Sequence, residues 1–207
     1  MGDLGVGTVQ RLGGEMVILD GSAWLAGADG KVSPVDDRTL TPFAVVCRFT
    51  PDVTRERAGP LDYPGILATL DAMVPGTATV MGIRVDGLFR GLALRSVHEQ
   101  RPPYLPLAAV VAHQTEWTVP SATGTLVGFR FPVAASGVEV PGYHLHFLAD
   151  DRTVGGHVLS AALAEGRFAM TACDELHVEL PPGVALGTPG ATDRAAIASV
   201  EAPRSDG

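Results

Sequence analysis

The sequence predicts an α+β fold rich in β-structure, and three observations lead to this class. Glycine and proline are frequent, with 25 Gly and 16 Pro among 207 residues, and they are spread along the whole chain. The apolar segments between them are short, which is typical of strands joined by turns rather than of a helical bundle. Hydrophobic residues make up 46% of the chain, enough to build a core for one large domain or two smaller parts.

Short apolar segments are predicted as strands because many of them are rich in the β-branched and aromatic residues that suit a pleated surface. In chain order they read GEMVILDG, TPFAVVCRFT, TATVMGIRVDG, GLALRSV, TGTLVGFRFPV, GYHLHFLAD, GHVLSAALAE, GRFAMTAC and ELHVELP.

Helices are expected to be few. YPGILATLDAMV, residues 63–74, has apolar residues at helical spacing, and YLPLAAVVAHQTEW, residues 104–117, has Pro106 early and a long apolar stretch after it. A third helix is expected after Thr192, whose hydroxyl can cap ATDRAAIASVE. The segment AHQTEWTVPSAT separates an apolar helical stretch from a second set of strands, so the predicted parts are residues 1–115 and 116–207.

Charge and patterning exclude several classes of function. The chain has 15 Lys and Arg against 23 Asp and Glu, a formal net charge of −8, and no basic cluster that could follow a phosphate backbone. Nucleic acid is therefore not expected as a partner, and a site for a small anion must supply local positive charge. No apolar run approaches the roughly 18–20 residues that span a bilayer, and the start lacks signal-peptide features. We therefore expect a cytoplasmic protein, with no membrane partner, in which Cys47 and Cys173 are reduced thiols.

The stretch GYHLHFLADDRTVGGHVLS places His144, His146 and His157 around a turn-like DDRTVGG segment. Residues two apart in a strand point to the same face, so His144 and His146 project together. If Asp150 and Asp151 form the centre of a hairpin turn, His157 lies opposite His144 and shares that face. A bulge at the following glycine pair would instead turn His157 away.

Three neutral imidazoles would leave a divalent ion with open coordination positions, as in a catalytic zinc site. Neither cysteine is near the hairpin in sequence, so a closed structural zinc shell with thiolates is not expected. On spacing alone the alternative stays open, namely that these are ordinary half-exposed strand residues. Spacing alone also does not identify a reaction.

The segment GYHLHFLADDRTVGGHVL resembles the metal-binding segment of bacterial α-acetolactate decarboxylases. The resemblance extends over nearly the whole chain, through GVGTVQRLGGEMVILDG, TPFAVVCRF, LALRSVHEQRPPYLPL and GTLVGFRFP. It implies a two-part α+β fold with mixed sheets and an active site between the parts. It also implies a zinc lyase that converts acetolactate to acetoin and carbon dioxide, within acetoin and butanediol formation.

The resemblance also implies roles for particular residues. The metal ligands for Zn²⁺ would be His144, His146 and His157. The catalytic residues would be Glu15 in GGEM, Arg95 in LRS and Glu201 in IASVEAP, and Thr8 would join Arg95 in binding substrate. Gly13 stands where family members usually have aspartate, a departure expected to affect the turn but not the Glu15 carboxylate.

These residue types suit the implied reaction. Loss of carbon dioxide pushes an electron pair into the neighbouring ketone and gives an enediolate, which zinc would chelate as Lewis acid and template. Arg95 would hold the substrate carboxylate with its planar fork, and Glu15 would protonate the enediolate. Glu201 would assist proton transfer, orient a zinc-bound water or reach the metal.

Two other functions remain open at this point: another zinc lyase or hydrolase with a three-histidine site, and a non-catalytic binding module on the same fold. Arg95 together with Glu15 distinguishes the decarboxylase, because a small anionic substrate needs a carboxylate clamp and a proton donor. A homodimer is an expectation from apolar strands that would need covering.

Overall fold

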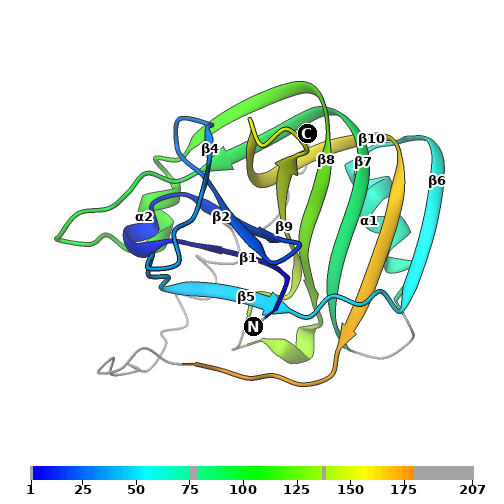
Figure 1. Ribbon diagram of the computed structural model, residues 1–207, viewed down its shortest axis with the longest axis horizontal. Helices are drawn as coiled ribbons and strands as arrows, with labels where there is room; N and C mark the ends of the chain where they lie inside the picture. The colour runs from blue at the N-terminus through cyan, green and yellow to red at the C-terminus, as the bar shows by residue number, and fades with distance from the viewer. Residues whose placement is uncertain (1, 75–78, 137–138, 180–207) are drawn as a thin grey trace.

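The computed structural model describes residues 2–74, 79–136 and 139–179, and two antiparallel sheets dominate it (Figure 1). The first sheet has the order β4-β3-β2-β1-β5. Its β2–β3 hairpin turns at Asp20 and Gly21, both with positive φ, which matches the preference of an Asp-Gly pair for a two-residue hairpin turn. The strands are β1 (Leu4–Thr8), β2 (Glu15–Leu19), β3 (Ser22–Ala26), β4 (Val32–Pro34) and β5 (Phe43–Cys47).

The second sheet has the order β6-β10-β7-β8-β9, and the start of β10 also pairs with β9. This extra pairing closes β7, β8, β9 and β10 into a ring at one end of the sheet. All ladders between the named strands are antiparallel, whereas mixed sheets were expected. The strands are β6 (Val53–Leu61), β7 (Val80–Ser96), β8 (Thr115–Phe131), β9 (Gly142–Ala149) and β10 (Gly155–Cys173).

The strands of the second sheet are longer than the sequence segments suggested. β7 runs without a break from VMGIRVDG of one predicted segment into GLALRS of the next, and β10 unites GHVLSAALAE with GRFAMTAC. Gly87 and Gly166, where those segments meet, pair with each other within a continuous ladder instead of ending it, because the neighbouring strands supply the hydrogen bonds. The polar β6, which was not predicted, is an edge strand held by β10.

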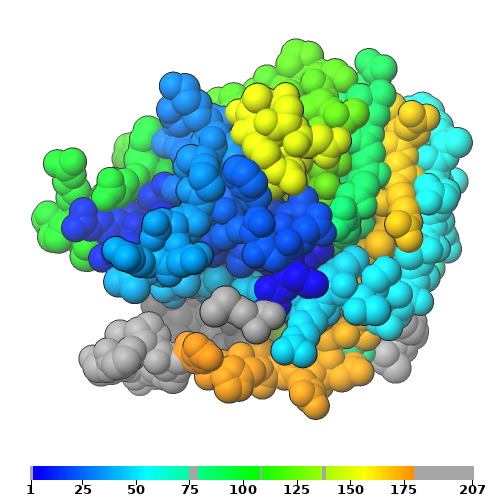
Figure 2. Space-filling model, viewed as in Figure 1, coloured from blue at the N-terminus to red at the C-terminus, as the bar shows by residue number. Residues whose placement is uncertain are grey.

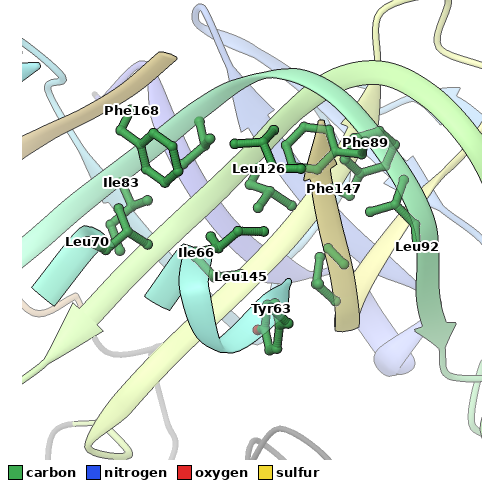
Figure 3. Close-up of a cluster of buried hydrophobic side chains, with 14 of the residues drawn as sticks. Tyr63, Ile66, Leu70, Ile83, Phe89, Leu92, Leu126, Leu145, Phe147 and Phe168 are labelled. Carbon is green, nitrogen blue, oxygen red and sulfur yellow. The ribbon is translucent and has the colours of Figure 1, made fainter. Parts of the chain in front are cut away.

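α1 (Tyr63–Asp71) is the longer of the two α-helices found in the described residues, and it covers the second sheet. Asp62 caps its first turn, with the side chain accepting from the Gly65 N–H at 2.9 Å. Tyr63, Ile66 and Leu70 are buried and pack against sheet residues that include Ile83, Leu126, Leu145 and Phe147 (Figure 3). This cluster is the main core.

A second core cluster joins the two sheets. Its buried residues are Leu4, Val6, Val17 and Leu19 from the first sheet and Val127, Phe129, Phe131 and Leu148 from the second. The sheets therefore pack face to face through β1 and β2 on one side and β8 and β9 on the other. Figure 2 shows the β9–β10 turn, in yellow, at the surface beside the blue first sheet, where Lys31 and Val154 form an isolated bridge.

Several of the helices and strands predicted from the sequence differ from those in the structure. The helix expected over residues 104–117 is only α2 (Leu107–Val111), because residue 115 already begins β8. Residues 175–179 of ELHVELP are not a strand, and the helix expected after Thr192 lies outside the described residues. Short 3₁₀ turns occur at Gln10–Leu12 and Val133–Ala135.

The two parts expected at 1–115 and 116–207 do not coincide with the two sheets. The sheets divide between β5 and β6, and β7 pairs with β8 across the expected boundary. Arg95 consequently belongs to the second sheet with the histidines, while Glu15 belongs to the first. Among the described residues, no helix has the length and apolar character needed to cross a membrane.

Candidate metal centre

The three histidines come together on the second sheet, at the place where β10 begins. His144 and His146 lie on β9 and project to one face, as their spacing predicts. His157 on β10 pairs directly with His146, not with His144 as predicted. The turn is centred between Asp151 and Arg152, one position later than expected, so the residue opposite any position of β10 shifts by two along β9. Because residues two apart share a face of the strand, His157 still projects to the same face as His144 and His146.

Local sequence explains how the hairpin holds this register. Asp151 accepts from the backbone N–H of Thr153 at 3.0 Å and from its hydroxyl at 2.7 Å, while Arg152 has a positive φ of 59°. Gly156 has φ of 149°, and a Cβ there would lie 2.8 Å from the carbonyl oxygen of Arg95. Glycine therefore allows β10 to approach β7 closely just before His157, and the bulge that would have turned His157 away does not occur.

The imidazoles are close enough to share one cation. One ligand atom from each histidine lies within 4.8 Å of the others, and the Nε2 atoms of His144 and His146 are 3.1 Å apart. Nitrogens bound to one tetrahedral zinc ion at about 2.0–2.1 Å are separated by about 3.3 Å. The described residues contain this one group of three or more potential ligands that meets the distance limit.

The backbone of the first sheet orients His146. Its Nδ1 lies 2.9 Å from the carbonyl oxygen of Met16 on β2, and a carbonyl can only accept, so Nδ1 carries the proton and donates. Nε2 then presents its lone pair toward His144 and Glu15. Burial lowers the pKa of His146 well below its ordinary value, and the neighbouring His144 lowers it further.

His157 has the same character. Burial is the main cause that lowers its pKa well below the ordinary value, and the positive charge of Arg95 is the next. His146 and His157 are 0% and 3% exposed, so both imidazoles are neutral at physiological pH. Neutral imidazoles are the protonation state that binds metal, and the donor set therefore fits a divalent cation of the zinc type.

A buried ion pair borders the histidines. The Nη1 of Arg95 donates to Oε1 of Glu15 at 2.9 Å, with side chains 4% and 9% exposed. Oε2 of Glu15 lies 3.4 Å from Nε2 of His146. The Glu15 carboxylate thus stands between the guanidinium and the imidazoles.

The register of the strands explains why these groups meet. Arg95 is the β7 partner of His157, so both come from adjacent positions in the second sheet. Glu15 begins β2, whose next residue, Met16, contacts His146. The candidate site is therefore built where the first sheet packs on β9 and β10.

Thr8 is the last residue of β1, and Gly13 lies in the connection between β1 and β2. Thr8 pairs with Glu15, is 8% exposed and donates its hydroxyl to the Gly14 carbonyl oxygen at 2.7 Å. This bond holds the connection before β2, and the predicted contact of Thr8 with substrate stays a prediction. Gly13 has φ of −77°, an ordinary backbone conformation, and Glu15 keeps its buried position with glycine there. Glu201 lies outside the described residues.

Two contacts at the site were missed by the sequence reasoning. The Met16 carbonyl is a backbone group, and its partner depends on how the sheets pack, so no residue pattern signals it. Phe43 on β5 stacks on the His144 ring with a centroid separation of 6.5 Å and an interplanar angle of 5°. The segment TPFAVVCRF was correctly read as a strand, but only the packing of β5 beside β9 brings Phe43 to the histidine.

Comparisons with known proteins agree on one family. The family model described as alpha-acetolactate decarboxylase matches residues 1–185. Over 180 residues, 87% of this chain, the sequence is 40% identical to the alpha-acetolactate decarboxylase of Methylococcus capsulatus, 39% to that of Methanosarcina mazei and 33% to that of Bacillus subtilis. The aligned region spans 69%, 62% and 71% of those relatives.

Solved structures are similar over almost the whole fold. The crystal structure of alpha-acetolactate decarboxylase from Bacillus subtilis strain 168 has a TM-score of 0.90 and 31% identity, covering 97% of this chain and 87% of that one. A Staphylococcus aureus protein of unknown function, described as similar to alpha-acetolactate decarboxylase, has a TM-score of 0.80 and 26% identity. It covers 84% of this chain and 74% of its own.

Proposed function

Because this chain belongs to the α-acetolactate decarboxylase family, we propose that it converts 2-acetolactate to acetoin and carbon dioxide, with zinc held by His144, His146 and His157. One structural observation supports the proposal in addition to the family membership. Three imidazoles converge within 4.8 Å, and a buried glutamate–arginine pair adjoins them. This arrangement provides a cation site, a fixed positive charge and a proton-carrying group in one place.

The reaction breaks the bond between the carboxylate and the carbon that bears the hydroxyl. The electron pair of that bond moves into the neighbouring ketone, and the resulting enediolate takes up a proton to become acetoin. A divalent cation on the three imidazoles would supply Lewis acidity toward the ketone and hydroxyl oxygens. Removing a single donor from a site that stabilises such charge typically costs about 2.7–4 kcal/mol in the barrier.

Arg95 attracts and orients the substrate carboxylate. The protein carries a net charge of −8, so a small anion depends on a local cation to enter. Nη1 of Arg95 donates a hydrogen bond to Oε1 of Glu15. A guanidinium has five N–H donors arranged in a planar fork. That planar fork suits a carboxylate, and this is the role we assign to Arg95 toward the substrate.

Glu15 moves the proton. Arg95 fixes Oε1, which leaves Oε2, the oxygen 3.4 Å from His146, directed toward the cation site. Once Glu15 has taken up a proton from solvent, Oε2 is the atom that delivers it to the enediolate carbon, and delivery to one face sets the configuration of acetoin. The burial of Glu15, His146 and His157 keeps bulk water from competing as proton source. We assign Thr8 to substrate binding and Glu201 to proton transfer on the family resemblance alone.

The test is acetoin and carbon dioxide release from racemic acetolactate by metal-stripped and zinc-restored protein. Zinc should restore turnover, and His146→Ala should abolish both stoichiometric zinc and turnover. His98→Ala is the matched control, since His98 is an exposed histidine bonded to Thr115. Glu15→Gln should retain zinc but lose most turnover. Stoichiometric zinc without acetoin above the spontaneous background would refute the decarboxylase and favour another zinc enzyme or a binding module.

A further inference from the structure

The two cysteines form a cluster outside the metal centre, at the interface of the two sheets. Cys47 ends β5 in the first sheet and Cys173 ends β10 in the second. Both are reduced and partly exposed, and both pack against the core cluster that joins the sheets. Figure 1 shows the arrowheads of β5 and β10 on the same, lower side of the molecule.

Strand register and sheet packing place the two cysteines beside neighbouring positions of β7, Cys173 opposite Val80 and Cys47 beside Gly82. Thr171 pairs with Gly82, and a Cβ built on Gly82 would lie 3.1 Å from Cγ2 of Thr171, so the Thr171 side chain occupies that face. Cys173 is two residues later on β10 and shares the face. The same built Cβ would lie 3.0 Å from Sγ of Cys47. Gly82 therefore leaves the space beside which the Cys47 sulfur lies, and the Cys47 thiol is near enough to influence the pKa of Cys173.

We propose that Cys47 and Cys173 are a thiol–disulfide exchange site, which a low-molecular-weight disulfide oxidises to a cross-link between the two sheets. The Cys173 thiolate attacks one sulfur of the small disulfide, forms a mixed disulfide and releases one small thiolate. Cys47 then gives up its proton and attacks the Cys173 sulfur, which releases the second small thiol. Two protein thiols are oxidised and one small disulfide is reduced.

The environment of each thiol supports this order. The hydrogen bond from Cys47 is the main cause that lowers the pKa of Cys173 to about 7, with a further bond from the Gly82 backbone, so much of Cys173 is thiolate near neutral pH. The same hydrogen bond is the main cause that raises the pKa of Cys47, followed by burial. Once Cys173 is in a mixed disulfide it carries no negative charge, so the cause that keeps Cys47 protonated is removed.

The consequence of the cross-link is resistance to unfolding. The two cysteines are far apart in the sequence, and closing a long loop removes much of the conformational freedom of the unfolded chain. The cross-linked sheets are those between which Glu15 and Met16 meet the histidines. A typical disulfide in a chain of this length raises Tm by about 5–15 °C.

The experiment uses the whole chain, first reduced, freed of reductant and then incubated with oxidised glutathione. The intact mass should fall by two hydrogen atoms, titratable thiols under denaturing conditions should disappear, and peptide mapping should link Cys47 to Cys173. Tm should rise by about 5–15 °C and return on reduction. The double variant Cys47→Ser/Cys173→Ser is the control, and its Tm should not respond to oxidised glutathione.

Single variants test the order of attack without depending on a Tm change. Cys47→Ser should accumulate a stable glutathione adduct on Cys173, whereas Cys173→Ser should react at least about tenfold more slowly, because its remaining thiol lacks a lowered pKa. Two titratable thiols per wild-type chain after oxidation, or a cross-link between chains in place of one within a chain, would overturn the proposal. Equal reactivity of the two single variants would overturn the assigned order.

Discussion

Gly156→Ala should weaken both the fold and the metal centre, because the backbone there has a conformation and a contact that only glycine accommodates. Its φ is 149°, and the added Cβ would lie 2.8 Å from the Arg95 carbonyl oxygen and 3.1 Å from Cζ2 of Trp117. Backbone strain of this kind costs about 1–3 kcal/mol, and displacing packed neighbours costs about another 1–3 kcal/mol. At about 2–4 °C per kcal/mol, Tm should fall by roughly 5–20 °C.

The displacement should also reach the cation site, because His157 follows Gly156 directly and pairs with both Arg95 and His146. Misplacing a group that orients a metal ligand commonly lowers metal affinity by about 10–100-fold. The assays are thermal unfolding of the metal-free protein and zinc titration against a competing chelator at a temperature where the variant is folded.

Gly59→Ala is the matched control for Gly156→Ala. Gly59 also has positive φ, at 105°, but a Cβ there meets nothing within 4 Å, so only the backbone strain applies. Its Tm should fall by less, and its zinc affinity should be unchanged. Equal losses of Tm in the two variants would refute the idea that close approach of β10 to β7 is what requires glycine at 156.

Three further predictions concern the charged and titratable groups. Arg95→Met should destabilise the protein by about 3–5 kcal/mol in chemical denaturation, because it leaves the Glu15 carboxylate buried without its cation, and adding Glu15→Gln should recover part of that loss. Arg95→Lys keeps the charge but loses the planar fork, so KM for acetolactate should rise by about tenfold or more in steady-state assays, and an unchanged KM would contradict substrate orientation by Arg95. The metal-free protein should lose stability as pH falls below about 6.5. His146 and His157 have lowered pKa in the folded state, so the unfolded chain binds more protons, at up to about 1.4 kcal/mol per pH unit for each imidazole. Denaturation midpoints at pH 7.5 and 5.5 measure this loss, and His157→Ala should reduce the slope.

Prediction from sequence succeeded where the pattern is local. Alternation in GYHLHFLAD correctly put His144 and His146 on one face, and the turn-forming residues between the histidine segments correctly indicated a hairpin. The helix predicted from Tyr63 on the spacing of its apolar residues does begin there, where the structure shows Asp62 as its cap. These features depend on residues within a few positions of one another.

Prediction failed where neighbouring strands overrule the local pattern. Glycines at 87 and 166 looked like strand ends, but β7 and β10 pair through them. β6 reads VTRERAGPL, which has no apolar face, and it is a strand because β10 supplies its hydrogen bonds. The partner of His157 was wrong because the turn is centred one position later than its two aspartates suggested.

The sequence by itself indicated which chemical groups the candidate site contains, namely three imidazoles on a hairpin, Glu15 and Arg95, because the residue types and the family resemblance can be recognised in the chain. Only the tertiary structure decided how these groups meet. Glu15 and Arg95 form a buried ion pair beside the histidines because β2 packs on β9 while β7 pairs with β10, and the Met16 carbonyl orients His146 for the same reason. Contacts between residues far apart in the chain depend on which faces the two sheets bury against each other, and no short segment encodes that choice.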